Sequence, residues 1–393
     1  MKAPEIFQSY HDYVMPTYTK LPIIFVKGKG SRLWDIHNKE YLDFFPGWGV
    51  GSLGHCHPKV VSAIRDQAPK LIFIANNFYN LPQAKLAKEI IYWSFPGKVF
   101  FCNSGAEANE GAIKLARKFG RGRYEIISFE NSFHGRTLAT VTAGGQTKYQ
   151  EGFEPLPEGF KYVPFNDLDA IGRAITAKTV AVMIELIQGE GGINVADKEF
   201  VVGLRRLCDE KKLLLIVDEV QTGIGRTGKF FCYQHFGITP DIMTLAKALG
   251  GGLPIGSMVV RDGIADTLTP GTHASTFGGS PLVCRGALAV LRAVGKEKLL
   301  SKAQTSGEYL FSKLNAFQKK YPAIKEVRGM GLMAGVDLHC PGKPVVEACL
   351  QQGLLINCTH DTVLRIMPAL NVTKKEIDRA MAILDSALAL LKG

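Results

Sequence analysis

Residues 213–252 read LLLIVDEVQTGIGRTGKFFCYQHFGITPDIMTLAKALGGG and contain two short apolar runs, 213–217 and 242–245. Such runs are typical of strands that a parallel sheet buries on both faces. The first run leads directly into Asp218, and the second leads into Lys247, shortly before three consecutive glycines. Because open parallel sheets bind ligands at the carboxyl ends of their strands, Asp218 and Lys247 are the first candidate site residues.

The middle of the chain repeats this alternation of apolar run, polar loop and helical pattern. A strand at 99–102, a turn at 103–105 and a helix at 106–119 follow one another, and further strands are expected at 125–129 and 180–184. This alternation predicts an α/β fold with a mostly parallel sheet flanked by helices.

From residue 281 the pattern changes to that of a separate α+β unit. Helices are expected at 282–294 and 299–320, strands at 327–337 and 354–367, and an amphipathic helix at 374–391. The first fifty residues contain strand-like pieces at 23–27 and 32–35 and fit neither unit by their pattern. We therefore expect three parts: an N-terminal segment (1–50), a large α/β domain (51–280) and a smaller C-terminal α+β domain (281–393).

The composition of the 393-residue chain is that of a globular protein, with 46% apolar and 21% charged residues. Its net charge of +11 favours anionic partners, namely nucleic acid, acidic lipid or small phosphates and carboxylates. The sequence shows no clustered basic stripe with stacking aromatics, and its apolar runs fall far short of the roughly 20 residues of a membrane span. Residues 1–10 lack the features of a secretory signal, so we expect a cytoplasmic protein that binds neither nucleic acid nor membrane.

The cysteines and histidines do not predict a metal site. Eight cysteines are scattered along the chain without any C-x-x-C pair, which indicates thiols kept reduced. The run His55-Cys56-His57 comes nearest to a metal cluster, but no second cluster follows at ligand spacing. We expect no metal.

Residues 223–228, GIGRTG, match the G-x-G-x-x-G fingerprint and offer a different function, that of a nicotinamide-dependent oxidoreductase. In a dinucleotide site, the first glycine follows the strand directly and the last glycine opens a helix. Here residues 218–222 intervene, and the segment after Gly228 is a poor helix start. The stretch also nearly matches a P-loop, but Phe230 stands where Ser or Thr is needed.

Three features at strand ends together describe a cofactor site. A lysine such as Lys247 can form a Schiff base with an aldehyde, and an aspartate such as Asp218 can keep a heterocyclic nitrogen protonated. The turn at Ser104, Gly105 and Ala106 opens a helix, and the free N–H groups of a helix start bind phosphate. Each feature alone is ordinary, but the three together indicate pyridoxal 5′-phosphate.

Residues 213–252 also resemble the signature of the class III pyridoxal phosphate-dependent aminotransferases, and the resemblance covers essentially the whole chain. It includes 41–44 (YLDF), 52–58 (SLGHCHP), 101–109 (FCNSGAEAN), 132–137 (SFHGRT), 188–192 (QGEGG) and 275–279 (STFGG). Within this family the chain is most similar to the acetylornithine aminotransferases, through 52–58 and through 355–358 (LINC) followed by Leu364-Arg365. The resemblance implies fold type I, with the N-terminal segment packed on the small domain, and a homodimer with shared active sites.

The resemblance also implies roles for single residues. Lys247 is expected to bind the cofactor covalently and, once released, to move a proton between substrate and cofactor, while Asp218 pairs with the ring nitrogen. Gln221 is expected to contact the ring hydroxyl, and Phe133 and Val220 are expected to contact the two faces of the ring. The phosphate is expected to be held by Ser104, Gly105 and Ala106 of the same chain and by Thr276 of the partner subunit. Without the resemblance, Phe133 and Val220 would be explained equally well as ordinary side chains of the hydrophobic core.

The implied substrates are a small amino acid and a 2-oxo acid. Arg136 is expected to bind the substrate's distal carboxylate, although a surface salt bridge would explain an arginine there equally well. Glu190 and Arg365 resemble the family's switch pair. When the two side chains are paired, the site is neutral next to the reacting carbon and suits an ω-amino donor. When Glu190 moves away, Arg365 can bind the α-carboxylate of glutamate. The expected reaction moves the δ-amino group of N-acetylornithine to 2-oxoglutarate by a ping-pong route.

One position departs from the pattern of the acetylornithine group. Trp48 stands where small or aliphatic residues are more usual, and there the far end of the donor is expected to lie. Trp48 therefore leaves other donors open, namely ornithine, succinylornithine, lysine derivatives and 4-aminobutyrate.

Overall fold

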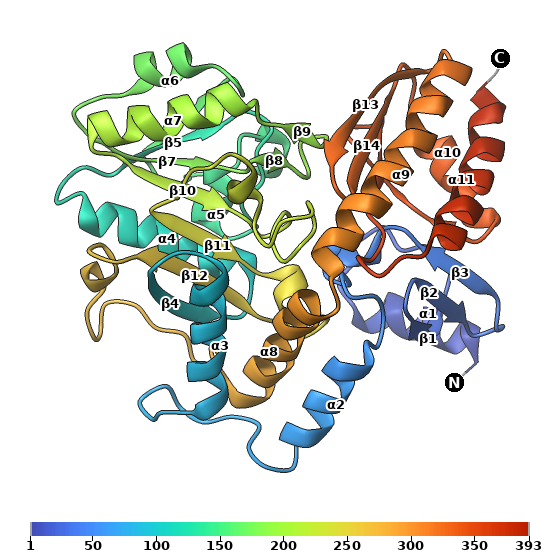
Figure 1. Cartoon of the computed structure of the whole chain (residues 1–393), viewed down its shortest axis with the longest axis horizontal. Coiled ribbons are helices and arrows are strands. Elements are labelled where there is room, and N and C mark those ends of the chain that lie inside the picture. Colours follow the sequence, from blue (N-terminus) through green and yellow to red (C-terminus); the bar gives the residue numbers. More distant parts are fainter. Residues whose placement is uncertain (1, 392–393) are drawn as a thin grey trace.

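The computed structural model describes residues 2–391, and a seven-stranded sheet forms the centre of its larger part (Figure 1). In sheet order the strands are β4 (Gly97–Cys102), β12 (Gly256–Arg261), β11 (Ile242–Leu245), β10 (Leu214–Asp218), β7 (Thr179–Ile184), β5 (Glu125–Phe129) and β6 (Phe160–Val163). Strand β12 pairs antiparallel with β4 and β11, and the other neighbouring pairs are parallel. The predicted α/β fold with a mostly parallel sheet is confirmed.

Burial on both faces of the sheet explains the continuous apolar runs. Neighbouring residues of β10 pack into different hydrophobic clusters, Leu215 into one and Leu214 into the other. Helix α7 (Lys198–Lys211) contributes buried residues to the first cluster, and α4 (Gly105–Phe119) contributes to the second. The two helices therefore cover opposite faces of the sheet.

Further helices complete the large part of the molecule. They are α2 (Pro58–Gln67), α3 (Leu81–Trp93), α5 (Leu138–Ala143), α6 (Leu168–Ala174) and α8 (Pro281–Lys296). Helix α8 packs against α2 and α3 below the sheet in the view of Figure 1. Single-turn 3₁₀ helices occur at Pro46–Gly49, Thr147–Tyr149, Cys232–His235, Lys247–Gly250, Ala265–Thr267 and Ala389–Leu391, and β8 (Ile187–Gln188) and β9 (Asn194–Val195) form a small hairpin.

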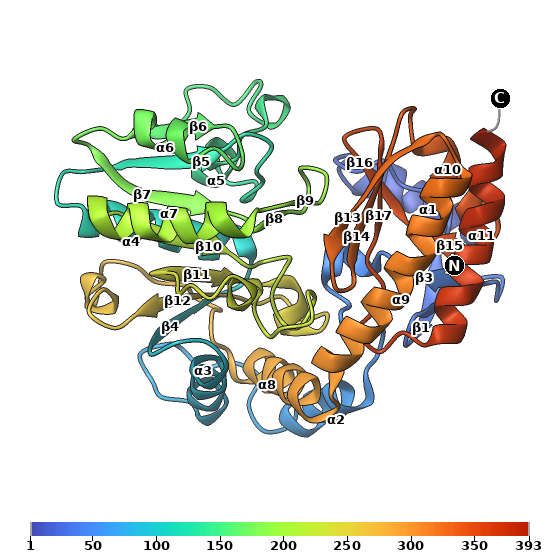
Figure 2. The same cartoon turned by 45° about the horizontal axis from the view of Figure 1, so that its top comes forward.

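The smaller part contains a second sheet, which has the order β13-β14-β17-β16. Its strands are β13 (Ile324–Met330), β14 (Met333–Leu338), β16 (Asn357–Thr359) and β17 (Val363–Ile366), and its helices are α9 (Leu299–Lys320), α10 (Lys343–Gln351) and α11 (Lys374–Leu388). Figure 2 shows α9, α10 and α11 on the side of this sheet that faces away from the large part.

Two strand predictions in this part are wrong. The expected strand 327–337 is a hairpin of β13 and β14 that turns at Gly331, where φ is +59°. The backbone of Thr227 lies so close to Gly331 that an added Cβ would stand 2.6 Å from the Thr227 carbonyl carbon. The expected strand 354–367 is broken into three short strands. His360 and Asp361 have positive φ between β16 and β17, so the chain reverses there.

The N-terminal residues join the C-terminal part through a third sheet. Strands β1 (Phe25–Lys29), β2 (Arg32–Asp35) and β3 (Glu40–Asp43) are antiparallel neighbours, and β3 pairs in parallel with β15 (Leu354–Leu355). Helix α1 (Ala3–Tyr13) precedes them and buries none of its residues. The division of the chain at residues 50 and 280 stays a prediction.

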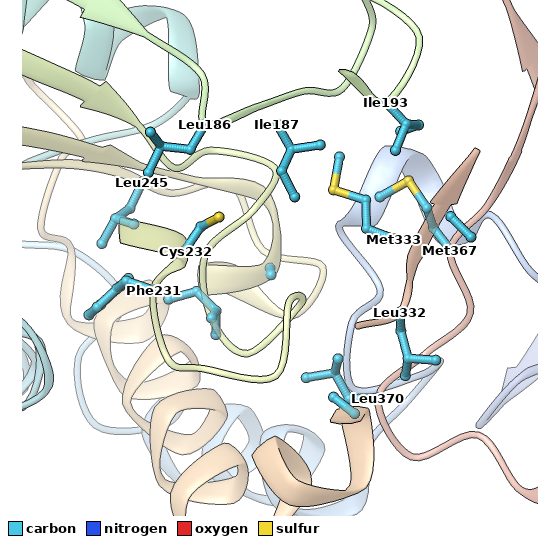
Figure 3. Packing of buried hydrophobic residues seen from close by; sticks show 14 of the residues in the cluster. Leu186, Ile187, Ile193, Phe231, Cys232, Leu245, Leu332, Met333, Met367 and Leu370 are labelled. Atoms are coloured by element: carbon cyan, nitrogen blue, oxygen red, sulfur yellow. The ribbon is translucent and has the colours of Figure 1, made fainter. Parts of the chain in front are cut away.

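The hydrophobic core continues from the large part into the small part. Figure 3 shows Leu186 and Ile187, which follow β7, together with Met333 of β14 and Met367, which follows β17; all four belong to one buried cluster. This shared core holds the two parts together beside the ends of the large sheet. Within residues 2–391, no helix is both long and apolar enough to cross a membrane.

Candidate active site

The carboxyl ends of the large-sheet strands open into a cavity of about 370 Å³. Asp218 is the last residue of β10, and Lys247 comes two residues after β11. The structure brings most of the predicted site residues to the lining of this cavity, namely Ser104, Gly105, Ala106, Phe133, Glu190, Asp218, Val220, Gln221 and Lys247. The topology of the sheet thus collects side chains that lie far apart in the sequence.

The Asp218 carboxylate is buried and held in a fixed orientation. Its Oδ2 accepts hydrogen bonds from Asn109 Nδ2 and His134 Nδ1, both at 2.8 Å, and its Oδ1 accepts one from the Val220 N–H at 3.0 Å. Burial opposes protonation of His134, but the hydrogen bond and attraction to Asp218 outweigh burial and raise the pKa of the imidazole. A carboxylate oriented in this way suits a protonated ring nitrogen.

Lys247 lies on the 3₁₀ turn Lys247–Gly250 with φ of +43°, followed by Gly251 and Gly252 at positive φ. Burial lowers the pKa of its ammonium group, although the nearby carboxylates of Glu190 and Asp218 act in the opposite direction. Lowering the pKa of a lysine favours the neutral amine, which is the form that acts as nucleophile or base.

The N-terminus of α4 forms the second wall of the cavity. Ser104 is its N-cap, and its hydroxyl oxygen accepts a hydrogen bond from the Glu107 N–H at 3.1 Å. A Cβ on Gly105 would stand 2.9 Å from a methyl carbon of Val220, so glycine is required for the backbone to lie this close to the cavity wall. The N–H groups of Gly105 and Ala106 belong to the first turn, which has no helical acceptor for them, and they suit a phosphate group.

Glu190 and Arg365 form the predicted pair. Glu190 Oε1 accepts a hydrogen bond from Arg365 Nη1 at 2.6 Å. Burial raises the pKa of Glu190, but attraction to Arg365 outweighs it, so the net pKa lies below the ordinary value and Glu190 is a carboxylate. Arg365 is 1% exposed and does not line the cavity itself, whereas Glu190 does.

Besides Arg365, three predicted residues lie outside the lining of this cavity. Trp48 is 47% exposed, and its backbone oxygen accepts a hydrogen bond from Gln221 Nε2 at 3.4 Å. The Arg136 guanidinium is exposed and lies 4.0 Å from the ring centre of Tyr149, and among residues 2–391 it forms no ion pair. Thr276 is exposed in the loop before α8. The expected roles of Trp48, Arg136 and Thr276 stay predictions.

Four polar residues of the cavity, Asn103, Asn109, His134 and Glu185, were not predicted as site residues from the sequence. Asn109 and His134 hold Asp218, and Glu185 accepts hydrogen bonds from the Phe133 N–H at 2.8 Å and the Gly189 N–H at 3.2 Å. Burial raises the pKa of Glu185 to about 7. One signal was available, because Glu185 follows the apolar run of β7 as Asp218 follows that of β10.

The glycine-rich stretch 223–228 serves a structural purpose. In the described chain no helix begins at Gly228, so the element that a dinucleotide fingerprint requires is missing. Arg226 is fully buried there, and it donates hydrogen bonds to the backbone oxygens of Leu332 and Pro368 at 3.0 and 2.5 Å. The stretch therefore ties the large part to the small part.

The two histidines of the His55-Cys56-His57 run each pair with a carboxylate. His55 Nε2 lies 2.7 Å from Asp43 Oδ2, and His57 Nε2 lies 3.5 Å from Glu297 Oε2. All eight cysteines are free thiols. Within residues 2–391, no group of three or more His, Cys, Asp or Glu side chains is arranged to hold a metal ion.

The cavity fits pyridoxal phosphate by its polar groups. Beside the oriented Asp218, the buried Oε1 of Gln221 accepts no hydrogen bond from any described residue, and such an orphaned acceptor suits a ring hydroxyl. With the helix start of α4 and the buried Lys247, whose pKa is lowered, these groups define an α/β enzyme that binds a phosphorylated ring cofactor.

The comparison with known proteins gives the family. Residues 13–388 match the family described as Aminotransferase class-III, and the chain belongs to that family. It is 52% identical to the acetylornithine aminotransferase of Methanocaldococcus jannaschii over 97% of both chains, and 53% identical to that of Caldanaerobacter subterraneus over 96% of this chain and 97% of the relative. The predicted family is confirmed.

A solved structure extends the likeness to three dimensions. The ornithine aminotransferase of Toxoplasma gondii is 34% identical and matches with a TM-score of 0.95 over 100% of this chain and 96% of that chain. That structure is described as having partial occupancy of PLP at its active site. The predicted fold type I is confirmed.

Proposed function

We propose that this enzyme transfers the δ-amino group of N-acetylornithine to 2-oxoglutarate, yielding N-acetylglutamate semialdehyde and glutamate, a reaction of arginine biosynthesis. The observation that carries the proposal is the buried Glu190–Arg365 pair at the cavity wall, 2.6 Å apart. A charge that one side chain can mask lets a single site accept both an ω-amino donor and glutamate. The two acetylornithine aminotransferase relatives support this choice of donor.

The cofactor is pyridoxal 5′-phosphate, which supplies an aldehyde that takes up the amino group and a ring that withdraws electrons from the reacting carbon. Ser104, Gly105 and Ala106 hold its phosphate, and Asp218 holds its ring nitrogen. The remaining contacts come from the side chains of Gln221, Phe133 and Val220, which line the same cavity.

Lys247 is the base of the reaction. Its Nζ must lose and regain a proton at neutral pH, and burial provides for this by lowering its pKa. His134 and Asn109 keep the Asp218 carboxylate in place, so Asp218 stays oriented while the proton moves at Lys247. Arg136 binds the distal carboxylate of both substrates with its planar guanidinium.

The active enzyme is a homodimer in the cytoplasm, in which Thr276 of the partner subunit completes the phosphate site. Large apolar side chains are exposed in two stretches. The first runs up to the start of α3 and contains Leu71, Ile72, Phe73, Phe78, Tyr79 and Leu81, and the second is the loop before α8, which contains Phe277. Asn76 Nδ2 joins the two stretches by donating hydrogen bonds to the backbone oxygens of Ser275 at 2.9 Å and Gly278 at 2.8 Å. An exposed apolar surface of this kind supports contact with a second copy.

The test is to purify the enzyme with pyridoxal phosphate and to add single donors. A yellow protein that loses its colour with N-acetylornithine, regains it with 2-oxoglutarate and releases glutamate is the expected result. N-succinylornithine, ornithine, lysine derivatives and 4-aminobutyrate are compared at equal concentration. A higher kcat/KM for any of these donors would refute acetylornithine as the substrate, and a protein that ignores the cofactor would refute the whole proposal.

A further inference from the structure

The guanidinium of Arg365 has strong partners besides Glu190. Its Nε and Nη2 both donate hydrogen bonds to Asn357 Oδ1, at 2.9 and 2.5 Å, and its Nη1 also donates to the backbone oxygen of Gly189 at 3.0 Å. The ring of Phe45 packs on the guanidinium, with the central carbon 4.7 Å from the ring centre. Four groups therefore surround this cation, and only one of them is the carboxylate of the switch.

The strand register brings Asn357 to this position. Asn357 and Arg365 are direct cross-strand partners in the antiparallel pair β16–β17, so their side chains leave the same face of the sheet. On the other side of β17, Gly335 is the cross-strand partner of Arg365 and has no side chain to compete for the guanidinium. Asn357 is thus the side chain that the sheet itself holds against Arg365.

Glu190 is held in a different way. Its backbone oxygen accepts a hydrogen bond from Thr359 Oγ1 at 2.7 Å, which ties the main chain to the same β16–β17 hairpin. Its side chain is 17% exposed, lines the cavity and accepts one hydrogen bond from Arg365, from Nη1 at 2.6 Å. The main chain of Glu190 is anchored, whereas its side chain borders the open cavity.

We propose that Asn357 is a positioning residue that keeps the Arg365 guanidinium in place while the Glu190 carboxylate moves away, and that it thereby determines how well the site takes substrates with an α-carboxylate at the reacting carbon. The inference rests on the proposed two-substrate function. An amide oxygen suits this task because it holds the guanidinium without neutralising its charge, so Arg365 can still bind a carboxylate.

The experiment compares Asn357→Ala and Asn357→Asp with the unchanged enzyme in both half-reactions. Removing the amide leaves two guanidinium nitrogens without their acceptor, so Asn357→Ala should lower kcat/KM for glutamate roughly tenfold or more, mainly through KM, and change the N-acetylornithine half-reaction less than about threefold. Asn357→Asp keeps the shape but adds a fixed negative charge, so it should also weaken glutamate selectively, with Arg365 still in place. Cys358→Ser, one residue along the strand, is the matched control and should leave the ratio unchanged.

Two further measurements separate positioning from mere stability and from the choice of donor. Melting temperature and cofactor affinity should remain near the unchanged values for Asn357→Asp. The affinity of each cofactor-loaded variant for 2-oxoglutarate, measured by calorimetry, should fall in both variants even if the true donor is another ω-amino compound. Equal losses in both half-reactions, or unchanged affinity for 2-oxoglutarate, would overturn the role of Asn357 and leave the proposed function standing.

Discussion

Replacement of Glu190 by alanine removes the acid that masks Arg365. In the structure the two side chains share a hydrogen bond of 2.6 Å, and Arg365 is 1% exposed, so solvent screens this interaction weakly. A hydrogen bond to a charged group contributes about 1.5–3 kcal/mol, and each 1.4 kcal/mol corresponds to about a tenfold change in an equilibrium or rate ratio. The preference for glutamate over N-acetylornithine should therefore rise by roughly one to two powers of ten.

The direction follows from the charges that each substrate presents. Glutamate brings an α-carboxylate to the reacting carbon and no longer has to displace Glu190 from Arg365. N-acetylornithine reacts at a carbon without a carboxylate and meets an uncompensated guanidinium instead. Arg365→Ala should act in the reverse direction and weaken the glutamate half-reaction more.

Single-turnover kinetics decide the matter, because each half-reaction changes the colour of the cofactor and can be followed alone. Glu40→Ala is the matched control, since Glu40 also forms a 2.7 Å pair with an arginine, Arg379, but at the exposed surface. It should leave the ratio of the two half-reactions unchanged. If Glu190→Ala and Arg365→Ala each slow both half-reactions equally, the pair is structural and the switch interpretation is refuted.

Other changes test the cofactor site, the dimer and the pair. Lys247→Ala should abolish turnover while the cofactor stays bound without a covalent link, and borohydride reduction of the unchanged enzyme should label Lys247; labelling of another lysine would contradict the assignment. Gly105→Ala puts a Cβ 2.9 Å from Val220, so cofactor affinity should fall while the melting temperature stays nearly constant, and unchanged affinity would contradict the cradle. Thr276→Ala should weaken cofactor binding in the dimer, and full activity of a verified monomer would exclude a shared site. The folded-state pKa of Glu190 lies below its ordinary value of 4.5, so its pair with Arg365 stabilises the fold fully above that pH and loses this effect as pH falls through the lower pKa. The difference in unfolding free energy between the unchanged enzyme and Glu190→Gln should therefore shrink as pH falls below 4.5, whereas a constant difference would contradict the pairing.

Apolar runs buried on both faces made the central strands predictable. The expected strands 125–129 and 242–245 have the observed bounds of β5 and β11, and the helix 299–320 has those of α9. Strands β6 and β12 were missed, because the first carries a lysine in a run of only four residues and the second begins at a glycine. Their places in the sheet come from pairing with neighbours, which a local pattern does not contain.

The breaks inside the C-terminal strands could not be read from hydrophobicity. Gly331 turns the hairpin of β13 and β14 because the backbone of Thr227 lies against it, and Thr227 is distant in the sequence. His360 and Asp361 take up positive φ without being glycines. In both cases a tertiary contact or a local backbone reversal overrides an apolar run.

The site residues that follow an apolar run at a strand end could be predicted from the sequence. The residues that contact them only through the tertiary fold could not. Asp218 and Lys247 end or follow apolar runs, and both line the cavity. His134 and Asn109 hold Asp218 from loops and helices distant in the sequence, so no spacing relates them to it. The same holds for Asn357, whose contact with Arg365 depends on the register of β16 and β17.

The distribution of these partners explains the chemistry of Lys247. Asp218 receives its hydrogen bonds from His134 and Asn109, Glu190 receives one from Arg365, and Glu185 accepts two backbone N–H groups. Within residues 2–391, Lys247 forms neither a hydrogen bond nor an ion pair with these carboxylates, although they lie close enough to raise its pKa. Burial therefore outweighs their attraction, and the net pKa of the lysine falls. A cavity whose acids are already occupied by other donors leaves its one lysine free to be a neutral amine, which is the state that amino transfer requires.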